Sequence, residues 1–196
     1  MKVLEVRHTA SMTLAAIANY DFMLLVPFHT ILSTVFSILL LLIVAGSGLG
    51  CGSGWIASPL AGVNSCYKFV TNQKASWSQA LGICCDMGGY LAALKTEPEI
   101  FWMKGYRSYH SIVSKYPSWI GGYKKDGAWY WKGDEADSPI TAADWAKGQP
   151  DNCCGGQNCL ALFGDSDPRQ PPTAWYRFDD DHCNAARPFI CEKPMN

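Results

Sequence analysis

The hydrophobic pattern separates an apolar N-terminal segment from a longer region of short amphipathic elements. Residues 23–46 contain no Asp, Glu, Lys or Arg, and residues 31–45 are mostly Ile, Leu, Val and Phe. A helix needs about 20 apolar residues to cross a bilayer, and residues 29–49 meet that length. Residues 1–22 have little periodicity and no cysteine, so we expect a short N-terminal tail there.

Two interpretations compete for the apolar segment, residues 23–49. A signal peptide would use the apolar core and be cut near Ala45-Gly46-Ser47. An uncleaved transmembrane anchor accommodates the long preceding tail more easily, so we favour a single-pass membrane protein with an extracellular C-terminal domain over a secreted protein. N-terminal sequencing of the mature chain distinguishes them, because a start near Gly48 would eliminate the anchor.

Two capping boxes predict two amphipathic helices in the following region. The first box is Ser76–Gln79, and apolar residues follow at helical spacing up to Cys84, before the stop at Gly88-Gly89. The second box is Thr96–Glu99, and its helix is expected to end before about Tyr109.

After the second helix the pattern changes to short aromatic or aliphatic runs separated by turn residues, which is typical of strands. Between Lys132 and Pro172 the chain is rich in Gly, Pro, Asp and Asn, and a loop of this length is usually functional or disordered. One strand is expected inside it. The expected strands are residues 118–121, 128–131, 159–163, 175–178 and 187–191.

Composition and charge narrow the class of protein. The 196 residues fit one domain plus an accessory segment, and 48% hydrophobic residues suffice for a substantial core. The net charge is −1 and no basic cluster occurs, which argues against a nucleic-acid partner. All 9 cysteines lie at or after Cys51, so that part belongs in an oxidising compartment, and the odd number leaves at least one outside intrachain pairs.

Oxygen-bearing side chains gather between Trp145 and Cys191. Calcium takes six to eight oxygen ligands from carboxylates, carboxamides, carbonyls and water. The donors form two groups, residues 149–157 and residues 179–180, which are far apart in sequence. Cys159 follows the first group and Cys183 follows the second, so a disulfide between these two cysteines would bring the groups together. The candidate calcium ligands are Gln149, Asp151, Gln157, Asp179 and Asp180.

Residues 51–196 resemble the C-type lectin-like domain in its long form. The matching pieces occur in the family's order: Cys66-Tyr67-Lys68-Phe69, the helix to Cys84, Gly88-Gly89-Tyr90-Leu91, Trp119-Ile120-Gly121-Gly122, Trp129-Tyr130-Trp131, Gln149-Pro150-Asp151, Cys159, Cys183 and Pro188–Glu192. The resemblance implies an α+β fold with two helices flanking small antiparallel sheets and a long ligand-binding loop. It also implies the disulfides Cys51–Cys66, Cys84–Cys191 and Cys159–Cys183.

The resemblance further implies one calcium ion that holds the hydroxyls of a sugar. Gln149-Pro150-Asp151 is similar to the tripeptide of galactose-type members, where mannose-type members have Glu-Pro-Asn. Gln157 stands where Glu is usual and Asp179 where Asn is usual, so the number of carboxylates is kept while the hydrogen-bond pattern changes. A second calcium site is not expected, because Lys124-Lys125 stand where acidic ligands belong. The implied carbohydrate-binding residues are Gln149, Asp151, Gln157, Asp179 and Trp175.

These observations favour calcium-dependent binding of a carbohydrate or glycoprotein, with a calcium-independent recognition module for proteins or other surfaces as the alternative. An enzyme is not expected, since no nucleophile is placed with His182 by any motif. Cys85, Cys153 and Cys154 are left over from the implied disulfides. Cys153 and Cys154 form a vicinal disulfide, bind a metal or pair elsewhere, and the sequence leaves these alternatives open.

Overall fold

The computed structural model describes residues 50–110, 115–133, 136–165 and 175–195. The predicted tail (1–22) and apolar segment (23–49) lie outside these residues, so both interpretations of them remain predictions. Within the described ranges, none of the helices has the length and apolar character needed to span a membrane.

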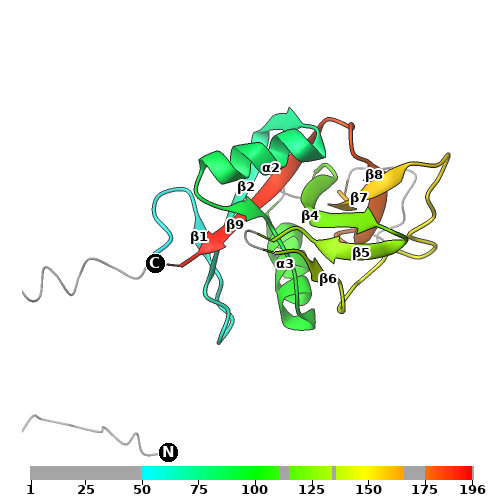
Figure 1. Cartoon of the computed structure of the whole chain (residues 1–196). Coiled ribbons are helices and arrows are strands. Elements are labelled where there is room, and N and C mark those ends of the chain that lie inside the picture. The colour runs from blue at the N-terminus through cyan, green and yellow to red at the C-terminus, as the bar shows by residue number, and fades with distance from the viewer. Residues whose placement is uncertain (1–49, 111–114, 134–135, 166–174, 196) are drawn as a thin grey trace, which may run out of the picture. The chain divides into compact units, whose positions relative to one another are not determined.

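Two helices and a set of short strands make up the described part of the chain (Figure 1). In chain order they are β1 (Ile56–Ala57), β2 (Ser65–Ala75), α2 (Trp77–Asp86), β3 (Tyr90–Leu91), α3 (Glu97–Tyr109), β4 (Ser118–Lys125), β5 (Ala128–Trp131), β6 (Ser138–Pro139), β7 (Gln157–Leu162), β8 (Phe178–His182) and β9 (Arg187–Pro194). The strand order is β1-β2-β9-β4-β5-β6, with β3 on β9 and with β7 between β4 and β8. The expected α+β fold is confirmed.

Both predicted capping boxes start helices. The Ser76 hydroxyl accepts the Gln79 N–H at 3.4 Å, and Gln79 Oε1 accepts the Ser76 N–H at 3.0 Å. Thr96 and Glu99 make the same reciprocal pair at the start of α3. These bonds satisfy amides that have no partner inside the helix. The helix α3 runs through Tyr109, slightly further than the sequence predicted.

The two helices cover opposite faces of the sheet at β9. Successive side chains of a strand point to opposite faces. Phe189 and Cys191 pack in one buried cluster with Ala80 of α2, whereas Ile190 between them packs in a second cluster with Ile100 of α3. Figure 1 shows α2 and α3 on either side of β2 and β9. The long loop instead contacts the part of the sheet formed by β7 and β8.

Close approach of two strands explains the glycine of the Trp119-Ile120-Gly121 motif. A Cβ atom at Gly121 would lie 2.6 Å from the Leu91 carbonyl oxygen, which is closer than real Cβ contacts. Any larger residue at this position would push β4 away from β3.

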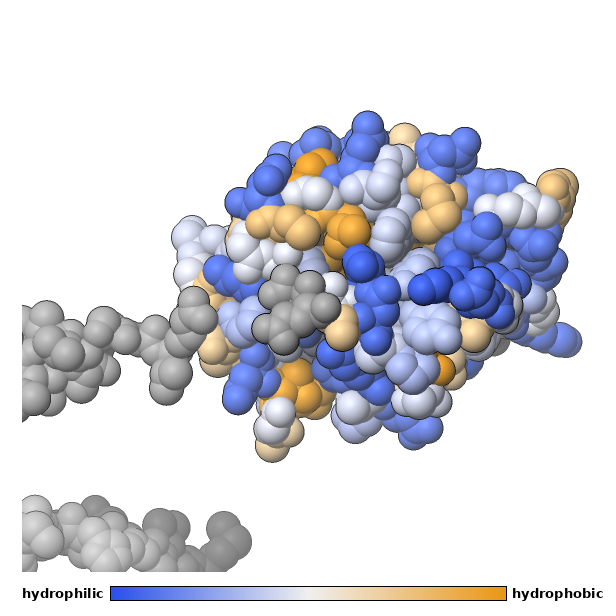
Figure 2. Space-filling view, viewed as in Figure 1, coloured by the Kyte–Doolittle hydropathy of each residue, from blue (hydrophilic) through white to orange (hydrophobic). Residues whose placement is uncertain are grey.

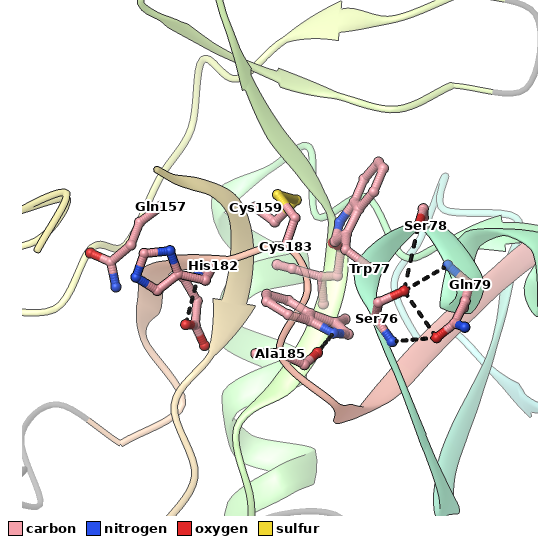
Figure 3. The surroundings of a disulfide bond; sticks show 12 residues. Ser76, Trp77, Ser78, Gln79, Gln157, Cys159, His182, Cys183 and Ala185 are labelled. Atoms are coloured by element: carbon pink, nitrogen blue, oxygen red, sulfur yellow. Dashed lines mark hydrogen bonds between the residues drawn. A yellow bond between two sulfur atoms is a disulfide. The ribbon is translucent and has the colours of Figure 1, made fainter. Parts of the chain in front are cut away.

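Three disulfides have the pairing that the resemblance implied. Cys51–Cys66 closes the short hairpin of β1 and β2, and Cys84–Cys191 ties α2 to β9. Cys159–Cys183 joins β7 to the residue after β8 (Figure 3). The remaining cysteines, Cys85, Cys153 and Cys154, are unpaired and exposed.

One predicted strand is wrong in position. Trp175 and Tyr176 form a turn instead of a strand, and Tyr176 has a φ of 62°. A bulky residue with positive φ cannot continue an extended strand. The strand β8 therefore begins at Phe178 and contains the three aspartates, Asp179 to Asp181. The strand predicted at residues 159–163 is shifted to Gln157–Leu162.

On the face of the molecule in Figure 2, apolar residues appear in separate small groups among polar residues. Large contiguous apolar patches mark protein or membrane interfaces. The face drawn in Figure 2 shows no such large patch.

Candidate functional site

The long loop is anchored to β8 before it reaches the candidate ligands. The Phe178 N–H donates to the Asp144 carbonyl, and the Ala146 N–H donates to the Phe178 carbonyl, both at 2.9 Å. The rings of Trp145 and Phe178 meet edge to face with centroids 5.8 Å apart. Apolar packing and backbone hydrogen bonds thus bring the loop to the strand that carries the aspartates.

Asp180 holds the Gln-Pro-Asp tripeptide in place. Its side chain is buried, and its two carboxylate oxygens accept the N–H groups of Asp151 at 2.9 Å and Asn152 at 2.8 Å. Gln149 Oε1 also accepts the Asp151 N–H at 2.9 Å, and the Gln149–Pro150 peptide bond is cis. The structure therefore brings together three of the predicted ligands, Gln149, Asp151 and Asp180.

Gln157 joins the same cluster through Asn152. The Gln157 N–H donates to Asn152 Oδ1 at 3.0 Å, and Asn152 is itself bound to Asp180. Gln157 begins β7 opposite His182, and Figure 3 shows the two side chains next to each other, near the Cys159–Cys183 disulfide. Gln157 Oε1 is buried and has no hydrogen-bond partner among the described residues. Buried polar groups normally have a hydrogen-bond partner, so a water molecule or a cation would satisfy this oxygen.

Asp179 interacts electrostatically with Asp151 and Asp180. Burial, together with the carboxylates of Asp181, Asp180 and Asp151, raises the pKa of Asp179 to about 8 against the opposing effect of Arg187. Arg187 forms an ion pair with Asp181. Three carboxylates thus disfavour the ionised form of Asp179, and a divalent cation bound between them would favour it.

The free energy of unfolding of the metal-free protein is expected to fall as pH rises. The pKa of Asp179 is about 8 in the folded state and about 3.9 in an unfolded chain. The folded state therefore binds more protons between these values, and its stability declines through that window by at most about 1.4 kcal/mol per pH unit. Urea unfolding between about pH 5 and pH 8.5 measures the slope.

An Asp179→Asn variant removes the titrating group and is expected to flatten this slope. Asp86→Asn is the matched control, because Asp86 is exposed at the end of α2 and far from the cluster in the sequence. An unchanged slope in Asp179→Asn would contradict the assignment of the pH dependence to this carboxylate.

The oxygen donors fit calcium by type. In the described part of the chain, no three His, Cys, Asp or Glu side chains are grouped closely enough to hold a metal ion. Calcium also accepts carboxamide and carbonyl oxygens, which Gln149 and Gln157 supply beside Asp151 and Asp180. These four side chains offer only oxygen ligands, whereas zinc prefers thiolate and imidazole.

Trp175 stands apart from these residues. It lies in the turn before β8, and its ring is 6.4 Å from that of Tyr176. No described contact connects it to Gln149, Asp151 or Asp180. Its role in carbohydrate binding remains a prediction.

Sequence reasoning did not identify two participants. Asn152 connects Gln157 to Asp180 through its side chain and its N–H, and among the nearby charges Asp181 raises the pKa of Asp179 most. The only sequence signals were their positions, directly after Asp151 and within the run of three aspartates.

Comparison with known proteins gives matches that cover most of the described domain. The family model "Lectin C-type domain" matches residues 73–193. Perlucin from Haliotis laevigata is 31% identical over 131 residues, which cover 66% of this chain and 76% of perlucin. The chain spans only 28% of the length of the CD209 antigen from Nomascus concolor, with 26% identity.

Solved structures show the same fold. The carbohydrate-recognition domain of the mouse scavenger receptor C-type lectin has a TM-score of 0.57 and 25% identity, and the match covers 74% of this chain and 98% of that one. A calcium-independent type II antifreeze protein has a TM-score of 0.58 and 22% identity, with 77% and 99% covered. At 22% identity, the similarity to the antifreeze protein shows a shared fold and nothing further.

Proposed function

Because this chain belongs to the C-type lectin domain family, whose model matches residues 73–193, we propose that its domain binds carbohydrate in a calcium-dependent manner. Members of this family are extracellular binding proteins rather than enzymes. The proposed ligand is a glycan or glycoprotein with a terminal galactose-type sugar, since Gln149-Pro150-Asp151 is the galactose-type tripeptide.

The observation that carries the proposal is the buried Gln157 Oε1, an acceptor without a described partner beside a group of carboxylates. A calcium ion would be held by oxygens of this kind and would in turn hold the hydroxyls of a sugar. In this proposal Gln149, Asp151, Gln157, Asp179 and Asp180 hold the ion, and their three carboxylates, which are too far apart to share an ion in this structure, move closer together when it binds. Asp180 also keeps the loop in position through the amides of Asp151 and Asn152.

The sugar hydroxyls would meet donors and acceptors on this chain as well as the ion. The carboxamides of Gln149 and Gln157 both donate and accept, whereas the carboxylates of Asp151 and Asp179 only accept. Gln157 therefore takes over the donor role that Asp179 cannot fill. Trp175 is proposed to contact the apolar face of the sugar.

Glycan binding is expected to require calcium and to favour terminal galactose. A glycan array is probed in calcium and again in EDTA, and the signal on galactose-terminated glycans is expected to disappear in EDTA and return with calcium. Binding that is insensitive to EDTA would contradict the proposal.

The double substitution Gln149→Glu and Asp151→Asn tests the specificity on the same array. It recreates the mannose-type tripeptide while keeping the total charge of the pair, so preference is expected to move from galactose to mannose by about tenfold or more. Asp86→Asn is again the control and leaves the preference unchanged.

We propose that the domain is displayed at the cell surface through the apolar segment 23–49, with secretion after signal cleavage as the alternative. The three disulfides support an oxidising compartment for residues 51–196.

A calcium-independent recognition module is the second candidate function. It is favoured by one observation: both oxygens of Asp180 already accept loop amides, so the loop is closed by hydrogen bonds of the chain itself. Calorimetric titration with calcium separates the two, since the calcium-free alternative predicts no binding heat and a ligand that stays bound in EDTA.

A further inference from the structure

The ligand loop carries two exposed cysteines that the fold does not use. Cys153 and Cys154 lie outside the three disulfides, and their Sγ atoms are 3.5 Å apart. An S–S bond is about 2.0 Å long, so a shift of about 1.5 Å separates the two thiols from a covalent link.

The pair occupies the centre of a tight turn. The Gly155 N–H donates to the Asn152 carbonyl at 2.8 Å, which closes a four-residue turn around Cys153 and Cys154. Cys154 has a φ of 64°, a conformation that favours glycine at this turn position. The backbone therefore holds a side chain where glycine would be less strained, and that side chain is a thiol next to another thiol.

The turn is hydrogen-bonded to the proposed calcium ligands on both sides. The Cys153 N–H donates to Asp151 Oδ1 at 2.9 Å. On the other side, Asn152 Oδ1 accepts the Gln157 N–H at 3.0 Å. A change in the backbone at Cys153 and Cys154 therefore moves groups that position Asp151 and Gln157.

We propose that Cys153 and Cys154 are a redox-active dithiol, and that its closure to a disulfide rearranges residues 151–157 and weakens calcium binding. The effect on calcium rests on the proposed function, whereas the redox chemistry does not. The open dithiol is the form with the loop hydrogen bonds described above.

The oxidant is a small disulfide of the glutathione class. One cysteine displaces half of it to give a mixed disulfide, and the other cysteine displaces the second half. The Cys153–Cys154 bond forms, the S–S bond of the oxidant breaks, two electrons pass to the oxidant, and the two thiol protons end on its released thiols.

Adjacent residues make a disulfide that is easily reduced. Their Cα atoms are about 3.8 Å apart across a trans peptide, below the usual minimum of about 4.4 Å for a disulfide. Strained and exposed disulfides have more oxidising potentials than structural ones. Glutathione buffers are therefore expected to reduce this bond before the three structural disulfides.

The test uses the protein in a Cys85→Ser background, which removes the other free thiol. The protein is equilibrated in glutathione buffers of different ratios, and intact mass and binding of a trivalent arsenical, which bridges neighbouring thiols, report the state of the pair. Calcium affinity of each state is measured by calorimetry. The reduced form is expected to bind one arsenical per chain and to bind calcium about tenfold more tightly than the oxidised form.

Cys154→Gly is the decisive variant, since glycine suits the φ of this position. Its calcium affinity is expected to be independent of the glutathione ratio, and it binds no arsenical. If wild-type thiols never close, or if both forms bind calcium equally, the proposal is overturned. If the pair is oxidised and reduced reversibly but neither form binds calcium, the redox activity of the pair is confirmed. The proposed calcium site, and its control by the pair, are then both contradicted.

Discussion

Asp180→Ala is expected to lower the calcium affinity by at least about 100-fold, measured by calorimetric titration. The carboxylate of Asp180 is a proposed ligand and is also 0% exposed, with one loop amide on each oxygen. Removing it takes this acceptor away from the N–H groups of Asp151 and Asn152, and only the Asp151 N–H keeps another described acceptor, Gln149 Oε1 at 2.9 Å. The substitution removes a metal-coordinating carboxylate and also the hydrogen bonds that hold the loop in position. We therefore expect it to have the largest effect on calcium binding of any single substitution.

Two further variants separate charge from structure. Asp180→Asn keeps the shape and one acceptor oxygen, so it is expected to keep more of the loop while still weakening calcium binding. Asp86→Asn removes a negative charge from an exposed position on α2 and leaves the affinity unchanged. Wild-type affinity in Asp180→Ala, with the fold intact by circular dichroism, would exclude Asp180 as a ligand.

Loss of the Cys84–Cys191 disulfide is expected to be the largest stability effect in the domain. The bridge spans 107 residues, against 15 for Cys51–Cys66. By the loop-entropy relation, a loop of this length is worth about 4.7 kcal/mol, and the short one about 3 kcal/mol. Cys84 and Cys191 are also fully buried between α2 and β9, so their replacement disturbs packing as well.

Guanidinium unfolding of two double-alanine variants measures this difference. The Cys84→Ala/Cys191→Ala protein is expected to lose about 1.5 kcal/mol or more beyond the loss in Cys51→Ala/Cys66→Ala. The same loss in both variants, or the reverse order, would show that loop length does not set the contribution of these bridges.

Features that depend on a few neighbouring residues were predictable from the sequence. Each helix starts at its capping box because Ser76 with Gln79, and Thr96 with Glu99, satisfy amides within one turn. The fold and the disulfide pairing were predictable only through the family resemblance. Spacing alone does not select one pairing among the possible ones.

Features set by contacts between distant segments were not predictable. The position of β8 depends on its pairing with β7, where Leu160 is opposite Asp180, and on the turn at Tyr176. The role of Asn152 arises only when the loop meets Asp180, 28 residues away. The raised pKa of Asp179 depends on burial and on charges that the fold collects.

The central claim is that one calcium ion is held by Gln149, Asp151, Gln157, Asp179 and Asp180 and binds the sugar. A crystal structure of the domain with calcium and galactose tests it most directly. We expect one ion with oxygens of these five residues at about 2.3 to 2.6 Å and with two galactose hydroxyls completing its coordination. No ion at saturating calcium, or an ion held by other residues, would contradict the claim.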